Sequence, residues 1–228
     1  MTERYIRHIN LKQIGETGQK KLQQSSVLIV GVGGLGSPIS LYLAAAGLGR
    51  IGLIDFDTVS LSNLQRQILY TENDLGKPKV EIAHNKLKAL NSELKIDIYN
   101  FKLTVDNAEE IISNYDIIVD GCDNFDTRYC IDDICNKLKK PYVYGSIGEF
   151  KGQVSVFNYK GSKSYRDLFP ENYSENNDLP GVMGVTPGIT GTIQAAEVIK
   201  IITESGDVLR NKLLIIDILS MKQILLDY

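Results

Sequence analysis

Four polar residues have types and spacings that could serve phosphate chemistry: Asn63, Arg66, Lys79 and Asp123. Transfer of a nucleotidyl group requires cations that neutralise the β- and γ-phosphate oxygens, and a carboxylate that holds Mg²⁺. An NAD-dependent enzyme requires no such second set of charges. Considered singly, either cation is typical of a solvated surface, and Asp123 is typical of the cap of a helix starting at Asn124. Together the four residues indicate nucleotidyl transfer.

A glycine-rich loop precedes these residues and would hold the phosphates. Gly31, Gly33 and Gly36 form the spacing G-x-G-x-x-G, which permits a tight turn and a close approach of backbone to phosphate. The apolar run Val27–Val30 predicts a buried strand before the loop, and Leu35–Ala46 predicts a helix after it. The unsatisfied N–H groups at the start of that helix would face the phosphate.

The next predicted strand, Ile51–Ile54, ends at Asp55. In dinucleotide-binding folds, an acid about 20 residues beyond the glycine loop binds a ribose hydroxyl. A Rossmann-like glycine turn without a ligand is the alternative interpretation, but the strand, the loop, the helix and the acid all favour a nucleotide. Taken alone, this part of the chain is typical of an NAD site.

The elements that must position these residues alternate between strand and helix. This alternation continues as far as residue 144 and indicates a parallel sheet. The predicted helices are Lys79–Leu90, Asp106–Ser113 and Asn124–Leu138, and the predicted further strands are Ile96–Phe101, Asp116–Asp120 and Tyr142–Tyr144.

Polar or small residues follow the carboxyl ends of these strands, namely Gly31, Asp55, Asp120, Asp123 and Gly145. Open α/β sheets bind their ligands in the crevice at that edge. We therefore expect the candidate residues to meet there.

The pattern changes in the second half of the chain. Gln153–Asn158 alternates apolar and polar residues, as a half-exposed strand does, and residues 160–180 form a long polar loop. A helix over Thr186–Thr203 and two closing strands, Leu213–Asp217 and Gln223–Asp227, follow. The expected fold is α/β, with a Rossmann-like parallel sheet, C-terminal antiparallel strands and helices on both faces. We expect one domain over residues 1–228, with a helical arm at residues 1–25.

Composition argues against several function classes. The chain has 228 residues and a formal net charge of −3, so nothing in it suggests binding to nucleic acid or to an anionic membrane. The N-terminal MTERYIRH lacks the apolar region of a signal peptide, and no apolar run is long enough to cross a membrane. Three cysteines without a C-x-x-C pair fit a reducing cytoplasm, and His8 and His84 lack metal-ligand spacing.

Six segments carry a family resemblance: RYIRHI, GVGGLGS, DFDTVSLSNLQRQ, GKPK, DGCDN and GVMGVTPGITGTIQAAEVIK. They cover nearly the whole chain, which resembles the ThiF/MoeB/HesA family, relatives of the ubiquitin-activating enzymes. The resemblance implies a homodimer that binds ATP and Mg²⁺ and adenylates the C-terminal glycine of a ubiquitin-like sulfur carrier protein ending in Gly-Gly. A sulfur donor protein is a further expected partner.

The resemblance also assigns residues to the nucleotide site. Gly34 would lie against the phosphates, and Asp55 would hold the ribose. Asn63 and Arg66 would contact the phosphates, and Lys79 would lie on the triphosphate. The full set implied for the site is Gly31, Gly33, Gly34, Gly36, Asp55, Asn63, Arg66, Lys79, Asp123 for Mg²⁺, and Asn124.

One further arginine is implied to act from the partner subunit. Arg7, in RYIRH, matches an arginine that reaches into the partner's site and completes the neutralisation of charge, as an arginine finger does. Arg4 lies one helical turn away and is the alternative. With Arg66, Lys79 and Asp123, Arg7 forms the catalytic set that the resemblance implies.

Two departures from the family pattern limit the expected chemistry. Many relatives carry zinc on two C-x-x-C pairs, but Ser164 and Asp167 occupy the first pair's positions and the second pair would lie beyond Tyr228. We therefore expect no zinc. Asn177 stands where relatives often have a cysteine, so we expect the reaction to stop at the acyl-adenylate. Cys122 is interpreted as a small core residue.

Several alternatives stay open at this level. Thiamine thiazole synthesis is the first choice of pathway and molybdopterin synthesis the second. From other classes, the chain could be an NAD-dependent oxidoreductase or a non-catalytic carrier-binding module. Gln194, Ala195 and Glu197 are interpreted as packing and surface residues of an amphipathic helix.

Overall fold

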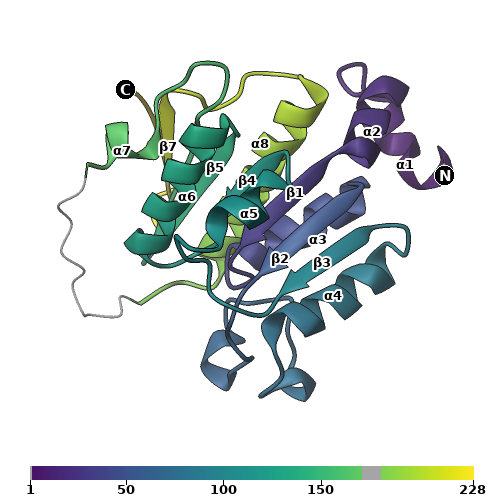
Figure 1. Cartoon of the computed structure of the whole chain (residues 1–228), viewed down its shortest axis with the longest axis vertical. Coiled ribbons are helices and arrows are strands. Elements are labelled where there is room, and N and C mark those ends of the chain that lie inside the picture. Colours follow the sequence, from purple (N-terminus) through teal and green to yellow (C-terminus); the bar gives the residue numbers. More distant parts are fainter. Residues whose placement is uncertain (1, 171–180) are drawn as a thin grey trace.

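The computed structural model describes residues 2–170 and 181–228 and contains an eight-stranded sheet (Figure 1). The strands run in the order β3-β2-β1-β4-β5-β6-β7-β8. The first five of them along the chain pair in parallel, and β6, β7 and β8 are added antiparallel. Their bounds are β1 Ser26–Val30, β2 Arg50–Ile54, β3 Lys95–Tyr99, β4 Ile117–Asp120, β5 Tyr142–Gly148, β6 Lys151–Phe157, β7 Lys212–Asp217 and β8 Lys222–Asp227.

Helices cover both faces of this sheet, and each layer buries its own hydrophobic cluster. One cluster joins α2, α3, α4 and α8 to side chains such as Val27, Ile29 and Ile51. The other joins α5, α6 and α7 to the alternate side chains Leu28 and Val30. The helix bounds are α2 Gly15–Gln24, α3 Gly36–Ala46, α4 Lys79–Leu90, α5 Ala108–Ser113, α6 Phe125–Leu138, α7 Tyr165–Leu168 and α8 Val185–Thr203.

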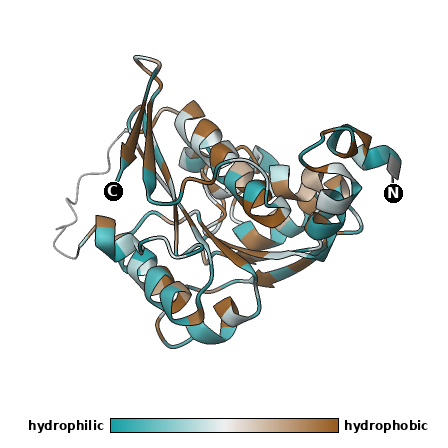
Figure 2. Cartoon of the chain, turned by 90° about the horizontal axis from the view of Figure 1, so that it is seen from above, coloured by the Kyte–Doolittle hydropathy of each residue, from teal (hydrophilic) through white to brown (hydrophobic). Residues whose placement is uncertain are grey.

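The predicted fold class is confirmed, because the parallel core, the antiparallel extension and the two helical layers are all present. Figure 2 shows the strands as a mainly apolar centre and the outer sides of the helices as polar. Strand registers agree with the predicted elements; for example, Val27 pairs with Ile51 and with Ile117.

Two details of the antiparallel part differ from expectation. The β5 strand extends to Gly148, so Gly145 lies inside a strand rather than after one. The β6 strand is not half-exposed, because Val154 to Phe157 are buried on both faces. Its polar residue Ser155 is satisfied within the core, since its hydroxyl donates to the carbonyl of Lys212 at 2.8 Å. The alternation of apolar and polar residues therefore predicted the strand correctly but did not indicate a face exposed to solvent.

The loop expected over residues 160–180 contains a short helix, α7, and its residues 171–180 lie outside the described part. Ser164 caps α7, and Asp167 donates its backbone N–H to the Ser164 hydroxyl while its side chain accepts from the Ser164 backbone. Ser164 and Asp167, the positions where the family resemblance implies a missing C-x-x-C pair, thus form a reciprocal capping box.

The N-terminal arm comprises α1 (Thr2–Ile9) and α2, and it lies beside the amino ends of the parallel strands. Tyr5 contacts Gly47, just before β2, and its hydroxyl accepts a hydrogen bond from Asn91, just before β3. Both views show the described N-terminal arm and the C-terminal hairpin at opposite ends of the molecule (Figures 1 and 2). Of the described helices, none is long and apolar enough to cross a membrane.

Candidate functional site

The glycine loop is held in direct contact with the turn that follows β4. Gly31 has a φ of 89°, and a Cβ there would lie 2.5 Å from the carbonyl oxygen of Gly121. A Cβ on Gly121 would in turn lie 2.3 Å from the carbonyl oxygen of Gly31. Gly36 is the first residue of α3, and a Cβ placed on it would lie 2.2 Å from the carbonyl oxygen of Gly31. Only glycine permits these approaches, so the loop and the turn form one backbone surface.

Asp55 ties the second strand to the glycine loop. One of its carboxylate oxygens accepts the backbone N–H of Val32 at 2.8 Å, and the other accepts that of Asp57 at 2.9 Å. Burial raises the pKa of the Asp55 carboxyl, and the nearby charge of Lys79 partly opposes this rise. Asp55 therefore lies at the loop, as predicted, and each of its oxygens keeps a further lone pair for a ligand hydroxyl.

Lys79 is the first residue of α4 and is buried, with 4% of its surface exposed. Its ammonium group donates to Asp57 at 2.8 Å. The Tyr70 hydroxyl bridges the region, because it donates to the carbonyl of Val32 at 2.7 Å and lies 3.4 Å from that of Lys79. The structure thus brings Lys79 beside the glycine loop, together with two residues that sequence reasoning missed, Asp57 and Tyr70.

Asn63 and Arg66 lie in a tight turn that packs on the loop. The carbonyl of Asn63 accepts the backbone N–H of Arg66 at 3.0 Å, and the Arg66 guanidinium donates to Ser62 at 3.2 Å. The Arg66 stem approaches Gly34, at 3.8 Å from a Cβ placed there. The predicted phosphate contacts therefore come together with Gly34 at the first turn of α3.

The next residue in this turn, Gln67, is buried beside Gly33. Its side-chain oxygen has no hydrogen-bond partner among the residues that the structure describes. A buried amide oxygen without a partner is uncommon in folded proteins, and this one lies beside the glycine loop. Gln67 was not singled out from the sequence, although it lies in the recognised SNLQRQ segment.

The Asp123 carboxylate is exposed on the turn after β4 and accepts only a 3.3 Å hydrogen bond from Asn124 among the described residues. The interpretation of Asp123 as a helix cap is wrong, because Asn124 caps α6 by accepting the N–H of Thr127 at 3.0 Å. This leaves Asp123 available to a ligand. One carboxylate beside a phosphate site fits Mg²⁺, which is bound mostly by waters, substrate phosphates and one or two acids.

A buried carboxylate shapes the turn that carries Asp123. Asp120 is completely buried and accepts from Arg128 at 3.0 Å and from Tyr142 at 3.0 Å. Its second oxygen accepts the backbone N–H of Cys122 at 2.9 Å, and the other arm of Arg128 donates to the Cys122 carbonyl at 2.9 Å. These bonds fix the turn from both ends. Neither Arg128 nor Tyr142 was predicted, because their partners come from separate elements.

Cys122 is a poor nucleophile in this setting. Its thiol donates to Asp120 at 2.9 Å. Burial, followed by the charge of Asp120, raises the pKa of the thiol well above its ordinary value. The interpretation of Cys122 as a small core residue agrees with this geometry. Among the described residues, Cys122, Cys130 and Cys135 are free, and no three acids, histidines or cysteines cluster around a metal position.

Gln194, Ala195 and Glu197 are all buried, so their interpretation as packing residues is confirmed and the interpretation of any of them as a surface residue is wrong. Gln194 is fully buried and donates to the carbonyl of Asp120 at 2.7 Å, which links α8 to the Asp120 turn. It fits because Gly145, directly opposite, has no Cβ; one placed there would lie 2.3 Å from the Gln194 side chain. Glu197 is also buried and accepts the backbone N–H of Leu209 at 2.9 Å.

The chain returns from the undescribed residues onto the Arg66 turn. Gly184, just before α8, contacts Gln65, and Gln65 donates to the carbonyl of Val182 at 3.4 Å. Pro187, in the first turn of α8, lies 3.1 Å from the position of a Cβ on Gly34. Residues 182–187, which precede and begin α8, therefore lie beside the glycine loop and the Arg66 turn. Asn177 falls outside the described residues.

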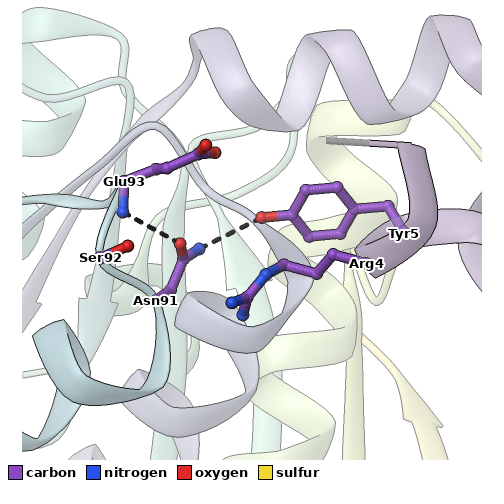
Figure 3. A pocket seen from close by; sticks show the side chains of 5 residues that line it. All are labelled: Arg4, Tyr5, Asn91, Ser92 and Glu93. Carbon is purple, nitrogen blue, oxygen red and sulfur yellow. Dashed lines mark hydrogen bonds between the residues drawn. The ribbon is translucent and has the colours of Figure 1, made fainter.

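The N-terminal arm distinguishes Arg4 from Arg7. Figure 3 shows Arg4 and Tyr5 in a pocket with Asn91, Ser92 and Glu93 at the end of α4. Arg4 donates to the carbonyl of Leu90 at 2.9 Å, which anchors α1 on the fold. Arg7 is exposed and makes no hydrogen bond or ion pair within the described chain. The arm lies across the sheet from the glycine loop, so Arg7 is not part of the site in its own chain.

The remaining candidate residues meet at one edge of the sheet, but the prediction that Gly145 belongs to this edge is wrong. Gly145 lies within β5 and packs on Gln194 rather than facing the crevice. Arg7, which is predicted to act in the site of a partner subunit, lies on α1 at the opposite edge of its own chain, where Tyr5 of the same helix bonds to Asn91. Its role in a partner's site stays a prediction. Gly31, Gly34, Asp55, Asn63, Arg66, Lys79 and Asp123 all lie on the loops and turns that follow the carboxyl ends of β1, β2 and β4, or on elements packed against them.

Two of the relatives found by comparison with known proteins are both named adenylyltransferases. A "Probable molybdopterin-synthase adenylyltransferase" from Porphyra purpurea is 52% identical over 204 residues, which are 87% of this chain and 53% of that protein. A "Sulfur carrier protein adenylyltransferase" from Thermus thermophilus is 43% identical over 227 residues, 95% of this chain and 83% of that protein. A solved structure of E. coli MccB with ATP is 26% identical with a TM-score of 0.83, and the match covers 98% of this chain and 71% of that chain.

The chain spans about half the length of the first curated relatives that it matches, 53% and 50%. The family model described as "ThiF family" matches residues 5–226, which is nearly all of the sequence. The glycine loop, the Arg66 turn, the buried Lys79 and the Asp120 turn all lie within that match. The chain belongs to the ThiF family.

Proposed function

We propose that this chain adenylates the C-terminal glycine of a ubiquitin-like sulfur carrier protein at the expense of ATP. The single observation that carries the proposal is that two cations and one acid lie around one glycine loop. They are Lys79, which is buried, Arg66, and Asp123, which is exposed. A dinucleotide-binding site needs the loop and Asp55 but not this set of charges. The relatives named as adenylyltransferases support the same reaction.

In the proposed reaction, a carboxylate oxygen of the carrier's last glycine attacks the α-phosphorus of ATP. A new P–O bond gives the acyl-adenylate, the α–β bridging P–O bond breaks, and pyrophosphate leaves with the electron pair. Arg66 and Lys79 neutralise charge on the departing oxygens, and Asp55 orients the ribose. Mg²⁺, held by Asp123 and the phosphates, would supply further neutralisation of charge.

The reaction needs no nucleophile from this chain. An acyl-adenylate is already a mixed anhydride, so a sulfur donor can attack it directly. The raised pKa of the Cys122 thiol and the absence of a cysteine at position 177 favour an enzyme that releases or passes on the adenylate without forming a covalent link to the carrier. Arg7 of a second copy of this chain would complete the site, in a homodimer of the cytoplasm.

Two carriers are the candidate substrates. The resemblance in sequence favours the carrier of thiamine thiazole synthesis, whereas the name of the 52% identical relative favours the carrier of molybdopterin synthesis. Both end in the same chemical group, a glycine carboxylate on a flexible tail. The body of the carrier must therefore decide between them.

The test is exchange of labelled pyrophosphate into ATP, with each purified carrier and with carriers that lack the last glycine. We expect Mg²⁺-dependent exchange with one intact carrier and none with its truncated form. Exchange with neither carrier, together with tight binding of NAD and none of ATP, would overturn the proposal in favour of an oxidoreductase. Carrier binding without exchange would instead identify a non-catalytic binding module.

A further inference from the structure

The charge of Lys79 is already neutralised in the structure without a nucleotide. A buried ammonium is costly unless an acid accompanies it. Asp57 supplies that acid, with 2.8 Å between its carboxylate oxygen and the Lys79 nitrogen. The two side chains are unequally placed: the lysine side chain is 5% exposed and the aspartate side chain 51%. The lysine is therefore fixed inside, and its counter-ion lies on the solvent side.

Backbone bonds hold this pair in place. The backbone N–H of Lys79 donates to the carbonyl of Asp57 at 3.0 Å, and Thr58 and Pro78 form a β-bridge beside it. Asp57 in turn donates its backbone N–H to Asp55, which accepts from Val32 of the glycine loop. A continuous chain of hydrogen bonds thus runs from the phosphate loop to the Asp57–Lys79 pair. These bonds fix the backbone of both residues close to the loop.

A triphosphate that binds to this loop brings its own negative charge to Lys79. The ammonium has three donors, but Asp57 occupies the solvent side from which the phosphates arrive. Two anions then share one buried cation, and they repel each other. After the reaction, pyrophosphate must give up the same lysine. Asp57 is still beside Lys79 at that point and can pair with its ammonium group again.

We infer that Asp57 is the resting counter-ion of Lys79 and that it sets the affinity of the site for the β- and γ-phosphates, and so for pyrophosphate. Asp57 is a positioning residue: it acts through Lys79. This inference rests on the proposed function, because it takes ATP as the ligand. It predicts that Asp57 weakens the binding of ATP and pyrophosphate without affecting AMP, which lacks the β- and γ-phosphates.

The test is calorimetric binding of Mg·ATP, Mg·pyrophosphate and AMP to the whole chain and to Asp57→Asn. We expect ATP and pyrophosphate to bind about tenfold more tightly to the variant, as removal of one partly screened like charge allows, with AMP unchanged. Asp57→Glu keeps the charge and should bind all three as the unchanged protein does. Each variant's thermal unfolding would be recorded alongside.

The matched control is Asp74→Asn. Asp74 pairs at 2.7 Å with Lys86, which lies on α4 as Lys79 does, so the variant loses an ion pair of similar length that does not involve Lys79. It should unfold at a lower temperature and bind all three ligands normally. Weaker ATP binding by Asp57→Asn, or an equal change for AMP, would overturn the inference and leave the proposed function standing. A wild-type chain that binds neither ATP nor pyrophosphate would overturn both.

Discussion

Asp123 differs from the other charged residues of the site because it makes almost no contact that stabilises the fold. Asp55, Lys79 and Arg66 each make bonds that hold the loops together, whereas Asp123 accepts one long bond from its neighbour Asn124. A residue of this kind can be removed with little change to the fold. Its loss therefore reports on chemistry alone.

Replacing Asp123 with alanine should reduce Mg²⁺-dependent pyrophosphate exchange by at least about a hundredfold, the usual size of losing one electrostatic contact to the transition state. Thermal unfolding should be unchanged. Asp126→Ala is the matched control, because Asp126 is an exposed acid in the first turn of α6. It should retain full exchange. Near-normal exchange by Asp123→Ala would remove this residue from the site.

Sequence reasoning found the candidate residues that follow strand ends, because periodicity locates the ends and parallel strands bring them to one edge. It missed the partners of those residues. Asp57 and Lys79 are 22 positions apart, and Gln194 and Asp120 are 74 apart. No local pattern joins such pairs; only the packing of α4 and α8 on the sheet brings them together. Similarly, Asn124 rather than Asp123 caps α6. Asp and Asn are both good capping residues, so the sequence does not decide which of the two neighbours is the cap.

At the scale of elements, β4, α6 and β5 meet at the buried Asp120. Arg128 from α6 and Tyr142 from β5 both donate to it, and Gln194 from α8 donates to its backbone. The guanidinium is almost fully buried, and the carboxylate opposite it keeps the pKa of Arg128 well above its ordinary value. The pair thus fixes α6 on the sheet and the turn of Asp123 with it.

Breaking this pair should cost much more stability than removing one neutral donor. Arg128→Ala leaves a buried carboxylate without its cation, so we expect the free energy of unfolding to fall by about 3–5 kcal/mol. Tyr142→Phe removes a single hydroxyl from the same oxygen and should cost about 1–3 kcal/mol. Urea denaturation of both variants at pH 7 measures the difference. Equal losses would mean that the ion pair contributes no more than the hydroxyl.

Most elements were predicted within a few residues, since buried strands and amphipathic helices repeat strongly along this chain. The exceptions have physical causes. The helix α7 has only four residues, too few for a periodic pattern. The alternation in β6 suggested a solvated face, but Ser155 makes its hydrogen bonds inside the core, so a polar residue there does not face water.

At the scale of the whole molecule, the arm and the site lie at opposite edges of the sheet. A five-residue strand such as β1 is about 16 Å long, further than an arginine side chain extends. Arg7 therefore cannot serve the glycine loop of its own chain. If it takes part in the reaction, it does so in a second copy.

Mixed dimers test this. Subunits carrying Arg7→Ala and subunits carrying Arg66→Ala should each be inactive, and mixing them should restore about a quarter of wild-type exchange. Half of the random dimers are hybrids, and one of their two sites keeps both arginines. Arg4→Ala should retain activity by itself, because Arg4 is occupied at the end of α4. No recovery, with hybrids verified by mass, would argue that Arg7 acts only structurally.

The contact between Gly31 and Gly121 has a consequence for how such a sequence can change over generations. A methyl group at either position would overlap the carbonyl oxygen of the other. Neither position can therefore be the first to mutate, and replacing both at once would still leave two side chains where two backbones now touch. We therefore expect both positions to stay glycine in related sequences even where the surrounding residues differ. An alignment of homologous sequences should show glycine at both positions, or at neither in proteins that no longer bind the nucleotide.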